Sequence, residues 1–323
     1  MSPLISSRPK RTAGPATCPS RGSTQAGSSL VGRLQRFRDL GVVAGYLAPS
    51  LVVFTVFVFF PLLFSLYLSF TKWDLISPNR AVVGLANYVR LYRDPLFWKV
   101  LRNTTVFSVS VVLAALALGL GLALAVNRPI RGRSIYRAGI FLPYVTSAAA
   151  MALVWLWIFD AQYGLLNGIL RAVGITGPLW LGSVDWALPA LILMTIWRFT
   201  GYDMLIFLGG LQNISSEIVE AARIDGANEW VLFRHITLPL LSPTTFFIAV
   251  TSFITMFQNF ETVYVMTHGG PVNATNMMVF YLYQNAFVFF EAGYASTIAV
   301  VLFALVVVLT ALQVRLSGEW VHY

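Results

Sequence analysis

The sequence predicts an all-α integral membrane protein, built as a bundle of six membrane-spanning helices. Hydrophobic residues make up 57% of the chain and charged residues only 11%, whereas a soluble domain has about 25% charged residues. The mean hydropathy is +0.73. Six apolar segments each approach the ~20 residues that a helix needs to cross a bilayer. Most of the chain is therefore expected to lie in lipid rather than in water.

The six predicted spans are separated by more polar segments. Their approximate limits are 42–70, 104–126, 138–159, 187–210, 242–266 and 293–314. The first span is long and carries Pro49 and Pro61, and proline removes a helical hydrogen bond, so we expect this span either to be kinked or to have ends that lie outside the membrane. The chain shows no internal repeat and no second set of six spans. A solute path is therefore expected to be shared between two subunits.

Three regions are predicted: a tail at residues 1–41, the six-span domain at 42–316 and a short cytoplasmic tail at 317–323. Residues 1–29 are rich in Ser, Gly, Pro, Thr and Arg, a composition typical of disordered segments. Residues 30–40 form either an interfacial amphipathic helix or the basic flank of the first span. The first apolar segment is too long for a signal peptide, and no small-residue cleavage site follows it.

The basic residues predict the orientation of the spans. Seven Lys and Arg residues precede the first span, and segment 127–137 has four arginines and no acidic residue. Segment 212–240 adds two arginines, whereas segment 160–186 has one and segment 267–292 has no basic residue. Cytoplasmic loops of membrane proteins carry an excess of Lys and Arg. We therefore expect both termini in the cytoplasm and the chain in a bacterial inner membrane.

Segment 71–103 does not follow this charge pattern. It carries six basic residues but lies on the outer side in the predicted topology. Asp94 and Pro95 are suited to be the N-cap and the first residue of a helix, and the apolar residues that follow can bury one face of it. We therefore expect a helix here that lies on the outer surface of the membrane.

Segment 212–240 is much longer than the roughly 2–8 residues that usually connect the helices of a bundle. Ser215 or Ser216 can cap a first helix, and Gly226 is placed to end it in a left-handed conformation. Asn228 can cap a second helix, which the next proline along the chain is expected to end.

The predicted helix pair carries large apolar residues. Ile218 and Ile224 lie on the first helix, and Trp230, Phe233 and Ile236 lie on the second. Two short helices that project from a membrane cannot bury such side chains alone. An exposed apolar patch of this kind indicates a binding partner.

One pattern of acidic, small and apolar residues extends over twenty residues of this segment. Its members are Glu220, Ala221, Ala222, Asp225, Gly226, Ala227, Ile236, Leu238 and Pro239. The pattern resembles the EAA loop of ABC importer permeases, in which the loop docks into a groove of the cytoplasmic ATPase. The resemblance implies an ATPase-coupling role for the residues of the helix pair. The candidates are Glu220, Ala221, Ala222, Asp225, Gly226 and, as an apolar contact on the second helix, Phe233.

Further segments, at residues 83–88, 141–143 and 269–271, are similar to the carbohydrate branch of that family, the maltose and glycerol-phosphate permease group. The resemblance covers roughly residues 42–316. It implies a six-helix type I ABC importer permease with cytoplasmic EAA coupling helices, importing a sugar or sugar-like solute. The implied partners are a second permease subunit, a cytoplasmic ABC ATPase pair and an extracytoplasmic solute-binding protein. ATP is then bound by the partner, and this chain needs no cofactor.

Residues for catalysis and metal binding are not arranged in known patterns. The single cysteine, Cys18, excludes a disulfide within the chain. His235, His268 and His322 lie far apart, and none of the three lysines lies in a phosphate-binding GxxxxGK[ST] loop. No nucleophile–base pair or metal motif is visible. We therefore expect no enzyme activity and no metal, and the distribution of basic residues indicates a membrane rather than nucleic acid as partner.

Charged residues inside the predicted spans are costly and usually face the bundle interior or water. Arg198 and Asp203 lie in the fourth span, about 140° apart around a helix, so they are poorly placed to pair with each other. The fifth span contains Gln258, Asn259 and Glu261, close to two phenylalanines. Fixed polar groups orient a ligand, and apolar and aromatic side chains cover the rest of it.

The candidates for the solute path are Arg198, Phe257, Gln258, Asn259, Phe260 and Glu261. Polar contacts between helices are the alternative role for these residues. The polar and aromatic groups favour a neutral sugar, with glycerol phosphate as the alternative solute, because Arg198 is the single cation within the predicted spans. A self-contained secondary transporter is a further alternative, but such proteins usually show an internal repeat.

Overall fold

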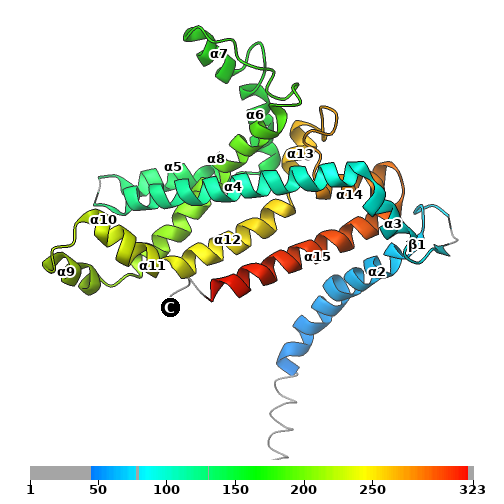
Figure 1. The fold of residues 1–323 in the computed structure, drawn as a ribbon, viewed down its shortest axis with the longest axis horizontal. Helices are drawn as coiled ribbons and strands as arrows, with labels where there is room; N and C mark the ends of the chain where they lie inside the picture. Colours follow the sequence, from blue (N-terminus) through cyan, green and yellow to red (C-terminus); the bar gives the residue numbers. More distant parts are fainter. Residues whose placement is uncertain (1–44, 78–79, 130, 319–323) are drawn as a thin grey trace, which may run out of the picture. The chain divides into compact units, whose positions relative to one another are not determined.

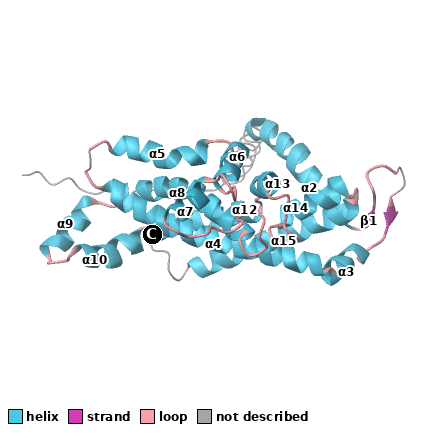
Figure 2. Ribbon diagram, turned by 90° about the horizontal axis from the view of Figure 1, so that it is seen from above, coloured by secondary structure: helices cyan, strands magenta, loops and turns pink. Residues whose placement is uncertain are grey.

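The computed structural model describes residues 45–77, 80–129 and 131–318. The chain divides into two compact units, residues 1–61 and residues 62–323. Helices make up most of the described chain, and Figure 2 shows a strand of the short hairpin that stands out among them.

The described part of the first unit, residues 45–61, is helical throughout. A π-helical turn, η1 (Thr55–Phe59), lies just before Pro61. Proline lacks the N–H that continues the helical hydrogen bonds. Near Pro61 the helix is not broken but contains this one widened turn. The candidate span Gly45–Ser69 contains this turn. The predictions for the tail at 1–41 concern residues outside those described.

Four helices of the described chain are long and apolar enough to cross a membrane. Besides Gly45–Ser69 they are α4 (Pro95–Asn127), α8 (Ala187–Gln212) and α15 (Ala292–Ser317). The predicted spans 187–210 and 293–314 lie wholly within α8 and α15. Two bent helix pairs raise the number to six if each pair is one span.

Helix α4 begins as predicted and then differs from the prediction. The side chain of Asp94 accepts a hydrogen bond from the backbone N–H of Leu96 at 2.8 Å, and Pro95 is the first helical residue. The helix runs without a break to Asn127 and has 33 residues in all. The expectation that the helix opened by Asp94 lies on the membrane surface, apart from the second span, is therefore wrong.

The physical reason lies in tertiary contacts of Asn103, just before the predicted start of the second span. Its Nδ2 donates to the backbone carbonyls of Asn273 and Asn276 at 3.0 and 3.1 Å. Because these hydrogen bonds satisfy the amide, Asn103 can be buried inside a continuous helix and does not have to lie in a solvent-exposed loop. A separate short helix, α3 (Ala86–Arg93), precedes α4 instead.

The predicted third span, 138–159, is not one straight helix. The structure has α5 (Arg133–Val145) and α6 (Ala148–Ile158), which are bent by 97° relative to each other. Pro143 lies in the last turn of α5, and Thr146 after it has extended backbone. Proline removes a hydrogen bond from this turn, which favours the helix end at this place.

The predicted fifth span, 242–266, is interrupted as well. Three residues separate the end of helix α12 (Ser242–Phe257) from the start of α13 (Glu261–Met266). The residues between them, 258–260, belong to the predicted solute path. At its other end, α12 is bent by 60° from the helical segment 229–240 that precedes it.

Helix α8 packs against α4, α5 and α12 (Figure 1). Glycines at two of these crossings allow a close approach. A Cβ atom at Gly119 of α4 would lie 2.7 Å from the Cβ of Asp203, and a Cβ at Gly201 would overlap the carbonyl oxygen of Ile140 in α5. Small residues at helix crossings are typical of membrane bundles, where close packing drives association.

The core lies between α4, α8, α12 and the residues before α14. Phe107, Leu191, Met256 and Met277 come from these four places, and each is at most 1% exposed. Outward-facing apolar residues of the same helices, such as Leu113, remain exposed in the isolated chain. Such faces are suited to lipid or to another subunit.

The remaining elements lie between the spans. They are β1 (Thr71–Lys72), β2 (Ala81–Val82), α7 (Leu165–Ala172), α14 (Met278–Tyr283) and the π-helical turn η3 (Gln284–Val288), and they follow α2 (Phe60–Ser69), which ends the candidate span Gly45–Ser69. Strands β1 and β2 pair antiparallel. Segment 267–292, expected to connect two spans, is packed into the bundle: the hydroxyl of Tyr281 donates to Oδ2 of Asp94 at 2.5 Å.

Candidate functional site

The first candidate site is the segment between α8 and α12, which is shaped by local caps. The Oγ of Ser215 accepts a backbone N–H two residues ahead at 3.2 Å, and α9 (Ser216–Ile224) begins there. Gly226 has a φ of +87°, and the N–H of Ala227 donates to the carbonyl of Ala222 at 3.0 Å. This is the Schellman motif, and it agrees with the predicted cap and turn.

A second helix follows the turn directly. The Oδ1 of Asn228 accepts the N–H of Val231 at 2.9 Å. The helix comprises α10 (Glu229–Leu232), the π-helical turn η2 (Phe233–Thr237) and α11 (Leu238–Leu240). The prediction that Pro239 ends this helix is wrong by one residue. The π-helical turn, in which the N–H of Leu238 donates to the carbonyl of Phe233, accommodates the proline.

An ion pair joins the two helices across the turn. The Nη2 of Arg223 lies 2.9 Å from Oε1 of Glu229. Both side chains are more than half exposed, so the pair contributes only ~0–1 kcal/mol to stability. The contact between Arg223 and Glu229 nevertheless limits the orientation of the two helices relative to each other.

Large apolar side chains of this helix pair stay exposed. Ile224 is 86% exposed and Trp230 is 65% exposed, and the ring of Trp230 lies 5.8 Å from the ring of Phe233. Two hollows, of ≈ 470 and ≈ 330 Å³, lie between the pair and the end of α4. Phe233 lines the larger one and Glu220 the smaller one. Exposed rings beside hollows are suited to a docking partner.

The other predicted coupling residues lie on the same helix pair. Ala221 is exposed, Ala222 is partly buried, and Asp225 is the exposed C-cap residue of α9. The structure thus places all six predicted coupling residues on two consecutive short helices and the turn between them.

The second candidate site is the interruption between α12 and α13. Gln258 and Glu261 are exposed there, and Asn259 is partly buried. The Nδ2 of Asn259 donates to Oγ1 of Thr262 at 3.3 Å, whereas its buried Oδ1 has no hydrogen-bond partner among the described residues. Irregular backbone at membrane depth is tolerated where it lines a water-filled cavity or is covered by protein. The interruption therefore presents a polar surface between two apolar helices.

The two phenylalanines of this stretch lie in different surroundings. Phe257 is 5% exposed and packs in a core cluster with Tyr281, so its ring faces the core and not the polar surface. Phe260 is partly buried, and its ring lies 5.1 Å from that of Tyr264 and 5.2 Å from that of Tyr283. Of the two predicted aromatic residues, the structure places Phe260 beside the polar groups and Phe257 in the core.

The fold brings Arg198 of α8 near Glu261 of α13. The carboxylate of Glu261 is close enough to attract the guanidinium, but the two groups do not form an ion pair. The Cζ of Arg198 lies 5.9 Å from the ring centroid of Tyr144 and 5.6 Å from that of Phe199, distances at which aromatic faces attract a cation. Its Nε is buried and has no hydrogen-bond partner in the described chain.

Asp203 is not the partner of Arg198, as its spacing on the helix predicts. It is 1% exposed, and neither carboxylate oxygen has a hydrogen-bond partner within the described residues. Because it lies against Gly119 of α4, it belongs to a helix crossing rather than to the polar surface at the interruption.

Two aromatic residues of the second site were not predicted from the sequence. Tyr264 follows Phe260 by four residues, a helical spacing that the sequence does show. Tyr283 comes from segment 267–292, which was expected to be a loop, so only the tertiary fold could place it. Among the described residues, no group of three or more His, Cys, Asp or Glu side chains could hold a metal ion.

Comparison with known proteins adds a family and several relatives. A family model described as the binding-protein-dependent transport system inner membrane component matches residues 115–320. The sulfoquinovosyl glycerol transport system permease protein of Agrobacterium fabrum is 34% identical, over 92% of this chain and 98% of the relative. The lactose transport system permease protein of Rhizobium radiobacter is 38% identical, over 88% and 97%. The sn-glycerol-3-phosphate transport system permease protein of Brucella abortus is 36% identical, over 86% and 94%.

Solved structures share the fold. One is a chain in the crystal structure of a bacterial ABC transporter involved in the import of the acidic polysaccharide alginate. It has a TM-score of 0.77 at 20% identity, over 88% of this chain and 98% of that chain. The alginate transporter in complex with an alginate pentasaccharide-bound periplasmic protein has the same TM-score and identity, over 88% and 96%.

Proposed function

Because this chain belongs to the family of binding-protein-dependent transport system inner membrane components, it is a permease subunit of an ABC importer, and we propose that it conducts a neutral sugar or sugar-like solute. It is a transport subunit and not an enzyme, as its relatives are permease proteins. The observation that carries the choice of solute is the polar and aromatic surface at the interruption between α12 and α13.

This surface has the chemistry that a sugar requires. Gln258, Asn259 and Glu261 supply donors and acceptors for hydroxyl groups, and Phe260 and Tyr264 supply aromatic faces for the C–H surface of the ring. Ligand sites commonly combine a few fixed polar groups with apolar and aromatic walls. The interruption of the helix supports the proposal, because it also leaves backbone groups available for hydrogen bonding.

A glycerol-phosphate-type solute is the second candidate, favoured by one observation. The buried Nε of Arg198 has no hydrogen-bond partner in the described chain, and guanidinium groups bind phosphate well. However, Glu261 is near the same guanidinium, and its carboxylate would repel a phosphate. The neutral solute is therefore the first choice.

The proposed topology has six spans, with both termini in the cytoplasm. It counts α5 with α6 as one span and segment 229–240 with α12 as another. The excess of basic residues in segments 127–137 and 212–240 supports this orientation. The exposed apolar faces of the spans support a second permease subunit that completes the path, and the family description supports delivery of the solute by an extracytoplasmic binding protein.

Segment 212–240 is the proposed contact with the cytoplasmic ATPase pair. Exposed Trp230 and Ile224, together with Phe233 beside its hollow, support a docking role. A rigid helix pair can convert closure of the ATPase dimer into movement of α8 and α12, because it is covalently joined to both. ATP is bound by the partner, and this chain supplies no cofactor site in the proposal.

Competition for uptake tests the choice of solute. The complete importer, reconstituted in vesicles with its own binding protein, transports a labelled neutral disaccharide in the presence of unlabelled competitors. We expect neutral sugars to compete and glycerol phosphate to have no effect. Competition by glycerol phosphate alone would replace the first candidate with the second. ATP-independent uptake by the chain alone would contradict the assignment of ATP binding to a partner.

A further inference from the structure

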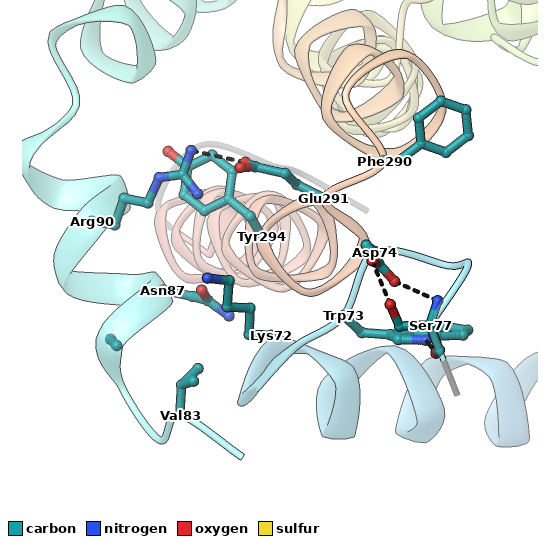
Figure 3. A pocket seen from close by; sticks show the side chains of 11 residues that line it. Lys72, Trp73, Asp74, Ser77, Val83, Asn87, Arg90, Phe290, Glu291 and Tyr294 are labelled. Atoms are coloured by element: carbon teal, nitrogen blue, oxygen red, sulfur yellow. Dashed lines mark hydrogen bonds and ion pairs between the residues drawn. The ribbon is translucent and has the colours of Figure 1, made fainter. Parts of the chain in front are cut away.

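A pocket of ≈ 430 Å³ lies between the β1–β2 hairpin, helix α3 and the first residues of α15 (Figure 3). Helix α2 ends at Ser69 and helix α15 begins at Ala292, so the pocket lies within a few residues of the ends of two candidate spans. It lies at the opposite end of α4 from the coupling segment (Figure 1). A bilayer has a headgroup region of roughly 5–8 Å on each side of its hydrocarbon core, and residues just beyond the ends of spans are expected in this region.

Side-chain contacts hold the walls of the pocket in place. The Nδ2 of Asn87 donates to two backbone carbonyls, at the end of α2 and in β1, both at 2.9 Å. Arg90 of α3 pairs with Glu291 at 2.8 Å, and its Cζ lies 4.1 Å from the ring centroid of Tyr294. The hydrogen bond to Glu291 raises the pKa of Arg90, so the guanidinium remains charged at any physiological pH. The pocket is thus formed without a ligand.

The acidic groups of the pocket already have partners, whereas one cation does not. The carboxylate of Asp74 accepts hydrogen bonds from the N–H and the hydroxyl of Ser77 at 2.7 and 2.8 Å. Lys72 lines the same pocket and is exposed, and its ammonium group has no ion pair or hydrogen bond among the described residues. Near its rim, Arg80 stands over the ring of Trp73 at 4.2 Å and has no carboxylate partner in the described chain either.

The segment that contains most of the pocket carries an excess of positive charge, which also favours an anionic ligand. Segment 71–103 has six basic and two acidic residues. In the proposed topology it lies on the side of the membrane where loops usually have few Lys and Arg residues. These charges therefore do not serve orientation, and an anionic ligand in the headgroup layer would account for them.

We propose that this pocket binds the phosphate group of an anionic phospholipid, with Lys72 as its main ligand and Arg90 as a second donor. Arg90 has further N–H groups besides the one that contacts Glu291. Trp73 and Phe290, which also line the pocket, provide aromatic rings at the headgroup level, where membrane proteins commonly carry them. A soluble phosphate ester has the same chemistry, but the pocket lies at the ends of two spans, where the phosphate of a lipid is always present.

Retention of lipid by the purified complex tests the proposal. The importer with full-length subunits is reconstituted into vesicles of equal amounts of phosphatidylglycerol and phosphatidylcholine, extracted in mild detergent, and its bound lipid is measured by native mass spectrometry. We expect the parent to retain phosphatidylglycerol in preference. Lys72→Gln should lower this retention about fivefold, the ratio that corresponds to ~1 kcal/mol per basic residue near an anionic surface. Retention of phosphatidylcholine should not change.

Arg93→Gln is the matched control, since it removes one exposed positive charge from the end of α3 outside the pocket. We expect it to retain phosphatidylglycerol like the parent. Equal losses in Lys72→Gln and Arg93→Gln, or no loss in either, would overturn the proposal. Displacement of the lipid from the parent by soluble glycerol phosphate would assign the pocket to a soluble anion instead. Because bound lipid is measured without transport, this result is independent of the proposed solute path.

Discussion

A Cβ atom added to Gly119 of α4 would lie 2.7 Å from the Cβ of Asp203 in α8. The position of Asp203 thus leaves no room for a side chain at residue 119. Asp203 is 1% exposed, so its side chain is enclosed by protein at this crossing. The contact determines how closely α4 and α8 can approach.

The first prediction concerns this crossing. Gly119→Ala should lower stability by about 1–3 kcal/mol, because overpacking forces neighbours to shift. Gly121→Ala is the control, since a Cβ there meets nothing within 4 Å and alanine favours a helix. Thermal unfolding of the complex in detergent measures both. A Gly119→Ala protein as stable as Gly121→Ala would contradict the close approach of the two helices.

The second prediction concerns the turn between α9 and α10. Gly226 has a φ of +87°, a conformation that glycine and asparagine tolerate and that a β-branched residue does not. Gly226→Val should insert normally in the membrane but bind the ATPase weakly and lose solute-stimulated ATP hydrolysis. Gly226→Asn should retain most of both activities. If valine and asparagine act alike in a pull-down of the ATPase, backbone conformation at this turn is not what matters.

The third prediction concerns the apolar surface of the coupling segment. Phe233→Ala should weaken ATPase association about 30-fold, the effect of losing an interface anchor of ~2 kcal/mol. Ile169→Ala removes an exposed apolar side chain from α7, at 54% exposure, and serves as the control. Association measured by surface plasmon resonance distinguishes the two. Unchanged binding of Phe233→Ala would exclude this residue from the interface.

The fourth prediction concerns the solute path. Glu261→Gln should reduce uptake about 10- to 150-fold, because it removes the charge of the acceptor and a hydrogen bond to a charged group is worth ~1.5–3 kcal/mol. Assembly and basal ATP hydrolysis should remain normal, because the residue lies in α13 and not in the coupling segment. Asp185→Asn, which neutralises an exposed carboxylate between α7 and α8, should leave uptake unchanged. Equal uptake in both variants would favour helix-to-helix contacts as the role of Glu261.

The fifth prediction concerns topology. In a protein with Cys18 replaced, a cysteine at Ser216 should react with a membrane-impermeant maleimide only after the membrane is opened. A cysteine at Gln162 should react in intact cells, because segment 160–186 is on the outer side in the proposed topology. Both positions are exposed in the chain. The reverse labelling pattern would invert the orientation and move the coupling segment away from the ATPase.

Local features of the fold could be predicted because they depend on neighbouring residues. The caps at Asp94 and Ser215 and the left-handed turn at Gly226 each involve hydrogen bonds within five residues of chain. The apolar lengths of the spans also depend only on composition along one segment. The EAA-like pattern of segment 212–240 is also local in sequence, and it indicated the family that the comparisons then showed.

Breaks within spans could not be predicted in this way. Residues 258–260 are apolar or uncharged like much of the fifth span, and a membrane helix could continue through them. Likewise, the sequence placed Asn103 at the end of a polar segment, just before the second span. In the structure its side chain lies within α4, because it donates a hydrogen bond to the carbonyl of Asn276, 173 residues away. Whether a polar group ends a helix or lies inside one depends on such distant partners.

The sequence by itself therefore determined the membrane class, the positions of apolar segments and the caps of the coupling helices, because hydropathy and capping act over a few neighbouring residues. Only the tertiary structure decided that Phe257 faces the core, that Tyr283 joins Phe260 beside the interruption, and that Arg198 lies near Glu261. The physical reason is that each of these arrangements depends on packing between helices that are far apart in the chain. Side-chain spacing along one helix sets which residues share a face, but the neighbouring helices decide what that face meets.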